Sequence, residues 1–310
     1  MTESVTTTST PTASNRGEQL LGSGYSAGMA LLFSVVVILA VTVHTGGRPF
    51  MMLSFRFALA SLFLFIGVAF AGRPLLPAKG ERWAVILAGT FGYATESALY
   101  FAALNHGKAG AVTLLFYTHP VWVMLAMIAI DRRAPAKRLL AALGLALAGS
   151  AIVVIGGGDV EVAPLGIALA LACSVTYAAY LVAADRTVKR TDPLTAAAWL
   201  SGGAALGNAM YAVLFHAAVL PRGTHDWLRI LEMAIFSAGA FAAMLAALRR
   251  VGAMRNSIIA VMEPFAVALL AWVFLHQRVT VTTAAGGVLI LTGAVMASLV
   301  RTTRLQEPNL

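Results

Sequence analysis

One stretch of the sequence places a carboxylate among three hydroxyl groups at helical spacing. Glu96 lies between Tyr93 and Tyr100, with Ser97 next to it, and residues at positions i, i+3, i+4 and i+7 share one face of an α-helix. Such a face can stack tyrosine rings on a solute and present a carboxylate to an ammonium group or a proton. The alternative is that Glu96 holds neighbouring helices together by hydrogen bonds.

Two further ionisable residues each precede a proline, His119 before Pro120 and Glu263 before Pro264. A proline inside a helix removes a backbone donor and kinks the helix, which exposes backbone polar groups to which a solute can bind. Alternatively, the prolines only shape helix packing. For Glu263, a structural salt bridge with Arg56 is the alternative to a binding role.

Other polar and aromatic residues inside apolar segments are further candidates for binding a solute. They are Tyr117, Trp122, Tyr177, Tyr180, Trp199, Asn208 and Ser237. Aromatic residues in membrane helices also serve simply for packing or as interface anchors. No catalytic constellation, nucleotide motif or metal-ligand spacing accompanies them. We therefore predict no enzyme, no cofactor and no metal.

The elements that carry these residues are predicted from composition. Of the 310 residues, 59% are apolar and 11% are charged, whereas soluble domains carry about 25% charged residues. The apolar residues form runs of about twenty, the length that crosses a bilayer. We predict ten transmembrane helices, over 25–44, 50–71, 82–104, 109–130, 136–156, 163–184, 194–219, 227–248, 253–275 and 280–300.

The basic residues concentrate on one side of this predicted membrane body. If the N-terminus lies inside, the inner segments carry 16 of the 22 Lys and Arg residues, the outer loops carry 5, and Arg56 lies within a helix. An excess of Lys and Arg marks the cytoplasmic side. We predict cytoplasmic termini, with a disordered tail over 1–24 and a tail over 301–310. The net charge of +9 thus reflects topology and predicts no nucleic-acid partner.

The chain also matches itself at a single offset of 144 residues. The clearest pairs are Trp83 with Trp227, Pro120 with Pro264, and Gly149 with Gly293. Helices three to five thus correspond to helices eight to ten, so the repeat contains five helices, and an odd number inverts the second copy. We predict an all-α integral membrane protein of two inverted five-helix repeats, 25–156 and 163–300, an arrangement that permits alternating access.

Several motifs resemble the EamA branch of the drug/metabolite transporter superfamily. They are the segment 54–57 around Arg56, the Ala-Ala-Leu endings at 102–104 and 246–248, the two prolines, and the stretch 263–272 followed by Arg278, Gly286 and Gly293. The resemblance implies bacterial inner-membrane export of amino acids and related metabolites, with YddG-like exporters the nearest group. It differs at His276 and Gln277, where family members often carry an acidic residue.

Together these features predict a secondary transporter in the lipid bilayer, with a central cavity lined by helices one, three, four, six, eight and nine. Few fixed charges and several aromatic residues favour neutral or aromatic amino acids, and other metabolites or drugs are the alternative. Either the substrate gradient or protons can drive such a carrier. A channel is a further alternative. We expect a small-molecule partner and a monomer or weak homodimer.

Overall fold

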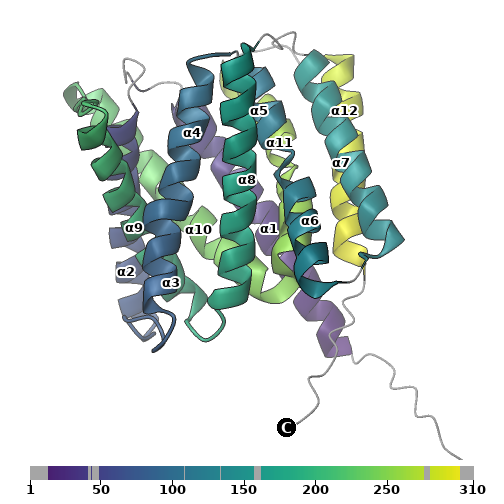
Figure 1. Cartoon of the computed structure of the whole chain (residues 1–310), viewed down its shortest axis with the longest axis horizontal. Helices are drawn as coiled ribbons and strands as arrows, with labels where there is room; N and C mark the ends of the chain where they lie inside the picture. The colour runs from purple at the N-terminus through teal and green to yellow at the C-terminus, as the bar shows by residue number, and fades with distance from the viewer. Residues whose placement is uncertain are drawn as a thin grey trace, which may run out of the picture.

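The structure is a computed structural model of a helical bundle (Figure 1). It describes residues 13–40, 43, 49–107, 109–132, 134–156, 162–275 and 280–300. Within these residues it forms twelve α-helices and one π-helix, η1, and no strand longer than an isolated bridge. The first half contains α1 (Ala13–Ala40), α2 (Phe50–Phe70), α3 (Arg82–Leu87), η1 (Ala88–Tyr93), α4 (Ala94–Leu104), α5 (Ala109–Phe116), α6 (His119–Asp131) and α7 (Lys137–Gly156).

The second half repeats this order with fewer interruptions. It contains α8 (Pro164–Thr187), α9 (Pro193–Leu214), α10 (Gly223–Ala260), α11 (Glu263–Leu275) and α12 (Val281–Leu299). Inside α10 the backbone departs from helical geometry at Gly252, where φ is 77°. Because residues with a side chain rarely adopt positive φ, this glycine allows two predicted helices to meet without a loop.

Seven helices of the described chain are long and apolar enough to cross a membrane, taking length and composition alone. They begin at Arg16, Phe50, Ala111, Lys137, Pro164, Gly223 and Val281. Three further predicted segments are built differently. The segment 82–104 contains the π-helix, 253–275 is interrupted, and α9 carries Ser201, Asn208 and several glycines. These ten segments correspond to the ten predicted membrane helices.

The helix contacts relate the two halves to each other. Helix α2 packs on its equivalent α9, and α7 packs on its equivalent α12. Helix α1 packs on α10, and the equivalent α8 packs on α4. In Figure 1, α7 and α12 stand together at one edge of the bundle, while α2 and α9 stand at the opposite edge. Helices α4, α8, α10 and α1 therefore lie between these two edge pairs.

Both halves interrupt the corresponding helix at equivalent positions. Helix α5 ends at Phe116 and α6 begins at His119; α10 ends at Ala260 and α11 begins at Glu263. The offset of 144 residues relates these boundaries. Pro120 thereby occupies the first turn of a new helix, where no backbone donor is needed. The prolines thus accompany complete breaks, sharper than the predicted kinks.

Glycines bring the paired helices into close contact. A methyl group on Gly207 would lie 2.2 Å from the Thr90 carbonyl oxygen, and one on Gly89 would lie 2.2 Å from the Leu200 carbonyl oxygen. Between α7 and α12, a methyl group on Gly149 would lie 2.5 Å from the Gly286 carbonyl oxygen. Because these gaps exclude any side chain, small residues are what allows the backbones to meet.

The predicted N-terminal tail is partly wrong. Residues 13–24 belong to α1, because Glu18 pairs with Arg250 at 3.2 Å and Gly22 packs against Arg250 and Val251. This contact with the end of α10 stabilises turns that are too polar to predict as a membrane helix. Residues 1–12 and 301–310 lie outside the described chain, as do His276, Gln277 and Arg278.

Two helix ends also differ from prediction. Helix α9 ends at Leu214 instead of residue 219, since Phe215 and His216 form a turn in which His216 has a φ of 49°. Helix α10 begins at Gly223, before residue 227, and Asp226 in its first turn accepts a hydrogen bond from the Arg222 amide. The first shift shortens α9, and the second lengthens α10.

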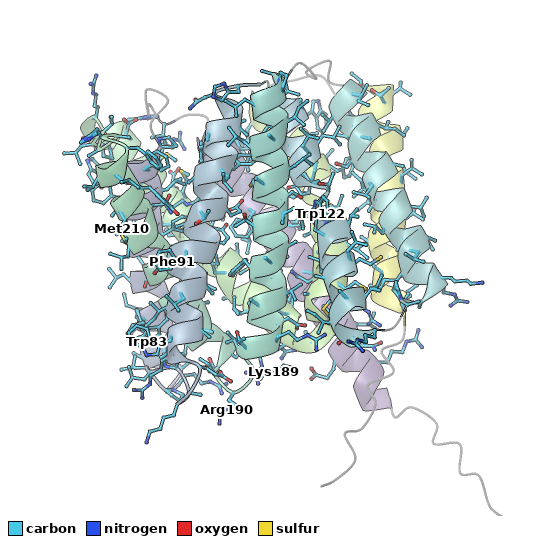
Figure 2. The ribbon with its side chains drawn as sticks, viewed as in Figure 1. Trp83, Phe91, Trp122, Lys189, Arg190 and Met210 are labelled. Carbon is cyan, nitrogen blue, oxygen red and sulfur yellow. The ribbon has the colours of Figure 1, made fainter. Side chains whose placement is uncertain are left out.

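At the end of the bundle with the loops 71–81 and 188–192, one carboxylate joins the two halves. The Glu81 carboxylate accepts hydrogen bonds from the amides of Lys189, Arg190 and Thr191 at 2.8–3.1 Å and from the Thr191 hydroxyl at 2.6 Å. Burial alone would raise the pKa of Glu81, but the hydrogen bonds from Thr191 and these amides lower it to about 2. Figure 2 shows Lys189 and Arg190 at this end.

Candidate functional site

A cluster of aromatic rings from α2, η1, α8 and α10 fills the middle of the bundle. The Tyr93 ring lies 4.9 Å from that of Phe241, 5.4 Å from that of Phe57 and 5.7 Å from that of Tyr180. Tyr177 stacks on Tyr180 with 5.9 Å between the ring centroids. These rings are buried. We call them the central aromatic cluster.

Glu96 lies one helical turn from Tyr93 and is 8% exposed. Its carboxylate accepts a hydrogen bond from the Ser97 hydroxyl at 3.2 Å, and the Cys173 thiol lies 3.7 Å away. The same thiol donates to the Glu96 carbonyl oxygen at 3.4 Å. Both donors are neutral. Among the described residues, no Lys, Arg or His nitrogen lies within 4.0 Å of the Glu96 carboxylate. On the next turn, the Tyr100 hydroxyl lies 2.8 Å from that of Thr113.

The helix break at residues 117–118 brings His119 into contact with the cluster. Its ring lies 4.9 Å from that of Tyr177. The Nδ1 atom lies 3.1 Å from the Phe116 carbonyl oxygen, and since a carbonyl only accepts, Nδ1 carries the hydrogen. The other nitrogen, Nε2, is buried with no hydrogen-bond partner. In a neutral ring, Nε2 is therefore an unused acceptor.

Glu263 begins α11 on the other side of the pseudo-two-fold axis. Its side chain lies next to that of Tyr117, and its backbone carbonyl accepts a hydrogen bond from the Ser34 hydroxyl on α1 at 3.2 Å. Tyr117 in turn lies 5.3 Å from Phe116, between ring centroids. The two helix breaks therefore contact each other through Tyr117, which belongs to one break, and Glu263, which belongs to the other.

Arg56 does not form the salt bridge with Glu263 that was the alternative to a binding role. Its guanidinium carbon lies 4.1 Å above the Phe57 ring, which lies 5.4 Å from the ring of Tyr93, one helical turn before Glu96. No salt bridge joins it to a carboxylate of the described chain. Its Nε atom is buried without a hydrogen-bond partner.

The predicted residues therefore divide into two groups. The structure brings Tyr93, Glu96, Ser97, Tyr100, Tyr117, His119, Tyr177, Tyr180 and Glu263 together, with Arg56 beside them. Pro120 and Pro264 follow the two breaks. The remaining four candidates, Trp122, Trp199, Asn208 and Ser237, have no described contact with these side chains.

Each of those four residues has a different environment. Trp199 donates a hydrogen bond to the Leu75 carbonyl at 2.8 Å and so holds the 71–81 loop. Trp122 is 36% exposed on α6, and Figure 2 labels it. Asn208 is buried in α9 and donates to the Ala204 carbonyl. Ser237 is buried one turn before Phe241 on α10, with its hydroxyl unpaired.

Sequence analysis missed Phe57, Phe241 and Met244. The Met244 sulfur lies 4.0 Å from the hydroxyls of both Tyr177 and Tyr180. The repeat held the signal that identifies two of them, because the offset of 144 relates Phe241 to Ser97 and Met244 to Tyr100. Residues equivalent to a functional face in the first half belong to the same interior face in the second.

Comparison with known proteins follows the same division into two halves. The sequence model of the EamA-like transporter family matches residues 20–155 and again residues 164–299. The starting points of these two matches are separated by the offset of the internal repeat. The matches include both helix breaks and every residue of the central aromatic cluster.

Individual relatives are more distant. An uncharacterized transporter of Archaeoglobus fulgidus is 26% identical over 64% of this chain and 71% of its own length. An uncharacterized transporter of Synechocystis sp. is 24% identical over 59% of this chain, and the match spans 56% of that protein. One crystal structure superposes with a TM-score of 0.77 at 22% identity, covering 92% of this chain and 97% of the other, which indicates a shared fold.

With both halves of the chain matched by one family, and with ten helical segments in two repeats, the assignment follows directly. The protein is a multi-pass membrane protein that belongs to the EamA-like transporter family of the drug/metabolite transporter superfamily.

Proposed function

We propose that this protein is a secondary transporter that exports amino acids with neutral or aromatic side chains by alternating access. One observation supports this most strongly. Both repeats interrupt a helix at the same place, and the breaks bring buried His119 and partly buried Glu263 beside aromatic rings. Discontinuous helices at the interface of inverted repeats are where transporters bind their substrates.

The substrate site is then the central aromatic cluster together with Glu96, His119 and Glu263. Rings of this kind suit apolar and aromatic side chains, since edge-to-face contacts between aromatic rings contribute about 0.5–1.5 kcal/mol each. Ionisable side chains in the hydrocarbon region cost about 2.5–3.5 kcal/mol on insertion scales, so such residues usually serve a pathway or a bound solute. This free-energy cost supports a binding role for Glu96, His119 and Glu263.

Exchange between two conformations would come from rocking of the two repeats about this site. Each repeat can adopt the conformation that its partner holds, because the same plan of helices occurs twice in opposite orientation. Close glycine contacts such as Gly207 on Thr90 and Gly149 on Gly286 supply surfaces on which paired helices can slide. The chain needs no nucleotide for this, and either the substrate gradient or a proton gradient can drive it.

The orientation rests on charge. Lys189, Arg190 and Arg249 lie at the end of the bundle that carries the 71–81 loop. Under the positive-inside rule this end faces the cytoplasm of a bacterial inner membrane, with both termini on that side. The 16-to-5 distribution of Lys and Arg between the two sides supports the same orientation. We further propose a monomer or weak homodimer.

The experiment that tests the proposal is solute flux in proteoliposomes. Amino acids, nucleosides and cationic drugs are compared as solutes, each with and without a pH gradient. Saturable counterflow of neutral or aromatic amino acids is expected, and a response to the pH gradient would identify proton coupling. Flux of cationic drugs alone would overturn the substrate class, and unsaturable ohmic flux would indicate a channel.

A further inference from the structure

The interior of the bundle holds a cation and an anion that are close but do not form an ion pair. Arg56 on α2 and Glu96 on α4 are each 8% exposed. Arg56 covers the Phe57 ring at 4.1 Å, and that ring lies 5.4 Å from the ring of Tyr93, one helical turn before Glu96. Even so, no nitrogen of Arg56 lies within 4.0 Å of a carboxylate oxygen of the described chain. Buried charges are normally paired, because an unpaired one costs several kcal/mol. The absence of an ion pair between Arg56 and Glu96 therefore requires an explanation.

Of these two residues, Arg56 offers hydrogen-bond donors. The guanidinium lies 4.1 Å from the Phe57 ring, which covers one face of the group, and the buried Nε–H has no acceptor. A guanidinium presents its N–H groups along its edge in a fixed fork, and a carboxylate matches two of them at once. The chemistry of Arg56 thus fits an incoming carboxylate better than a hydroxyl or an amide.

The Glu96 side offers acceptors. The carboxylate of Glu96 has a hydroxyl at 3.2 Å and a thiol at 3.7 Å as its side-chain partners, and the Nε2 atom of buried His119 has none. Tyr177 contacts the ring of His119 and the ring of Tyr93, which lies one helical turn before Glu96. An ammonium group carries three N–H donors and no acceptor. It would satisfy acceptors that the protein itself leaves with weak partners or with none.

We propose that Arg56 binds the carboxylate and Glu96 the ammonium group of one zwitterionic amino acid, so that the site selects solutes carrying both groups. This inference rests on the proposed function, whose substrate site it divides into two subsites. A simple amine leaves the Arg56 guanidinium unpaired, and a simple carboxylate leaves Glu96 without its cation. Sites that hydrogen-bond a substrate group reject analogues lacking it, because their own buried groups then stay unpaired.

The first test uses the unmodified protein in proteoliposomes and needs no variant. Counterflow of labelled L-phenylalanine is measured against unlabelled L-phenylalanine, phenethylamine and 3-phenylpropionate, and labelled L-leucine against L-leucine, 3-methylbutylamine and 4-methylpentanoate. The concentration for half-inhibition is expected to be at least tenfold higher for each analogue that lacks one charged group. Equal inhibition by either amine, or by either acid, and its parent amino acid overturns the inference while the transport function stands.

The failure of the proposed function gives a different result. If the amines alone move by saturable counterflow, the protein is a carrier but the two-subsite inference is wrong. If none of the six solutes moves and none inhibits, both the proposed substrate class and the inference are wrong. To separate these outcomes, each of the four analogues is also labelled and measured for its own counterflow, in addition to its use as a competitor.

The second test assigns each subsite to its residue. Arg56→Gln is expected to reduce the preference for phenylalanine over phenethylamine at least tenfold, and Glu96→Gln the preference for phenylalanine over 3-phenylpropionate. Arg56→Lys keeps the charge and should retain part of the first preference. Arg229→Gln is the matched control. Arg229 forms an ion pair with Glu232 at 2.7 Å, and this pair lies away from the site. Unchanged preferences in folded Arg56→Gln and Glu96→Gln proteins overturn the assignment.

Discussion

Two buried glutamates show how differently one residue type is used in this molecule. Glu81, in the loop between α2 and α3, accepts hydrogen bonds from three amides and a hydroxyl and lies 3.6 Å from the Arg190 guanidinium. Glu96, within the bundle, has a hydroxyl at 3.2 Å and a thiol at 3.7 Å. The first carboxylate is almost saturated by the protein, whereas the second is not.

This difference separates a structural role from a binding role. A saturated carboxylate gains nothing from a further ligand, and its hydrogen bonds hold the 71–81 loop of one half to the 188–192 loop of the other. Glu96 lies in the same interior as unpaired nitrogen atoms of Arg56 and His119. A ligand that forms hydrogen bonds with these groups gains binding free energy, because the groups are otherwise buried without partners. Residues of the first kind should therefore govern stability, and residues of the second kind should govern transport.

The largest expected effect follows from neutralising the unsaturated carboxylate. Glu96→Gln should weaken substrate binding about a hundredfold, since removing one partner of a buried charge pair costs about 2–5 kcal/mol. The free energy of unfolding should stay within about 1 kcal/mol of the unmodified protein, because Glu96 makes few contacts that amide chemistry cannot replace. Counterflow and denaturant titration in detergent measure the two quantities. Unchanged transport would place Glu96 with the structural residues.

The saturated carboxylate should give the opposite result. Glu81→Ala removes the acceptor for the amides of Lys189, Arg190 and Thr191, and the free energy of unfolding should fall by about 2 kcal/mol. Half-saturating substrate concentrations should change less than threefold. Denaturant titration and counterflow are again the measurements. A large change in substrate affinity without loss of stability would contradict the structural role of Glu81.

The same residue predicts a dependence of stability on pH. The pKa of Glu81 is lowered from 4.5 to about 2 in the folded protein. A carboxylate whose folded pKa is depressed stabilises the protein above its unfolded pKa, and that contribution is lost as the pH falls from about 4.5 to about 2. The unmodified protein should therefore lose more stability than Glu81→Gln across this window. Parallel loss in both proteins would contradict the hydrogen-bond account.

The smallest effect is expected at Trp199, a sequence-predicted substrate residue that contacts a loop instead. Trp199→Phe keeps a ring in edge-to-face contact with Phe65 but removes the hydrogen bond to the Leu75 carbonyl. Stability should fall by about 0.5–1.5 kcal/mol, the net value of one hydrogen bond. Transport should be unaltered, and a loss of substrate affinity beyond threefold would return Trp199 to the binding site.

Sequence periodicity predicted the ten segments and the face of Tyr93, Glu96 and Tyr100, because apolar length and helical spacing are local properties. The interruption before each proline followed from proline chemistry. Contacts across helices were harder to predict. Whether Arg56 meets Glu96 or Glu263, and whether Trp199 meets a solute or the Leu75 carbonyl, depends on how each helix is rotated.

Two local features were also not predicted from the sequence. The π-helix at Ala88–Tyr93 inserts a wider turn that ends at the first residue of the face with Glu96 and Tyr100. Its residues carry no periodicity that distinguishes it from an α-helix. The first turns of α1 are stabilised by the Glu18–Arg250 pair, a contact between residues far apart in the chain. The internal repeat could have predicted Phe241 and Met244, because the offset of 144 residues relates them to Ser97 and Tyr100.

The chain's single cysteine provides the most direct test of whether the transported solute occupies the interior cluster. Cys173 is fully buried, and its thiol contacts Glu96. Its modification by a membrane-permeant maleimide is measured in proteoliposomes with and without saturating L-phenylalanine or L-leucine. We predict that the transported amino acid slows modification at least tenfold. An unchanged rate in the presence of a solute that the same proteoliposomes transport would contradict the account.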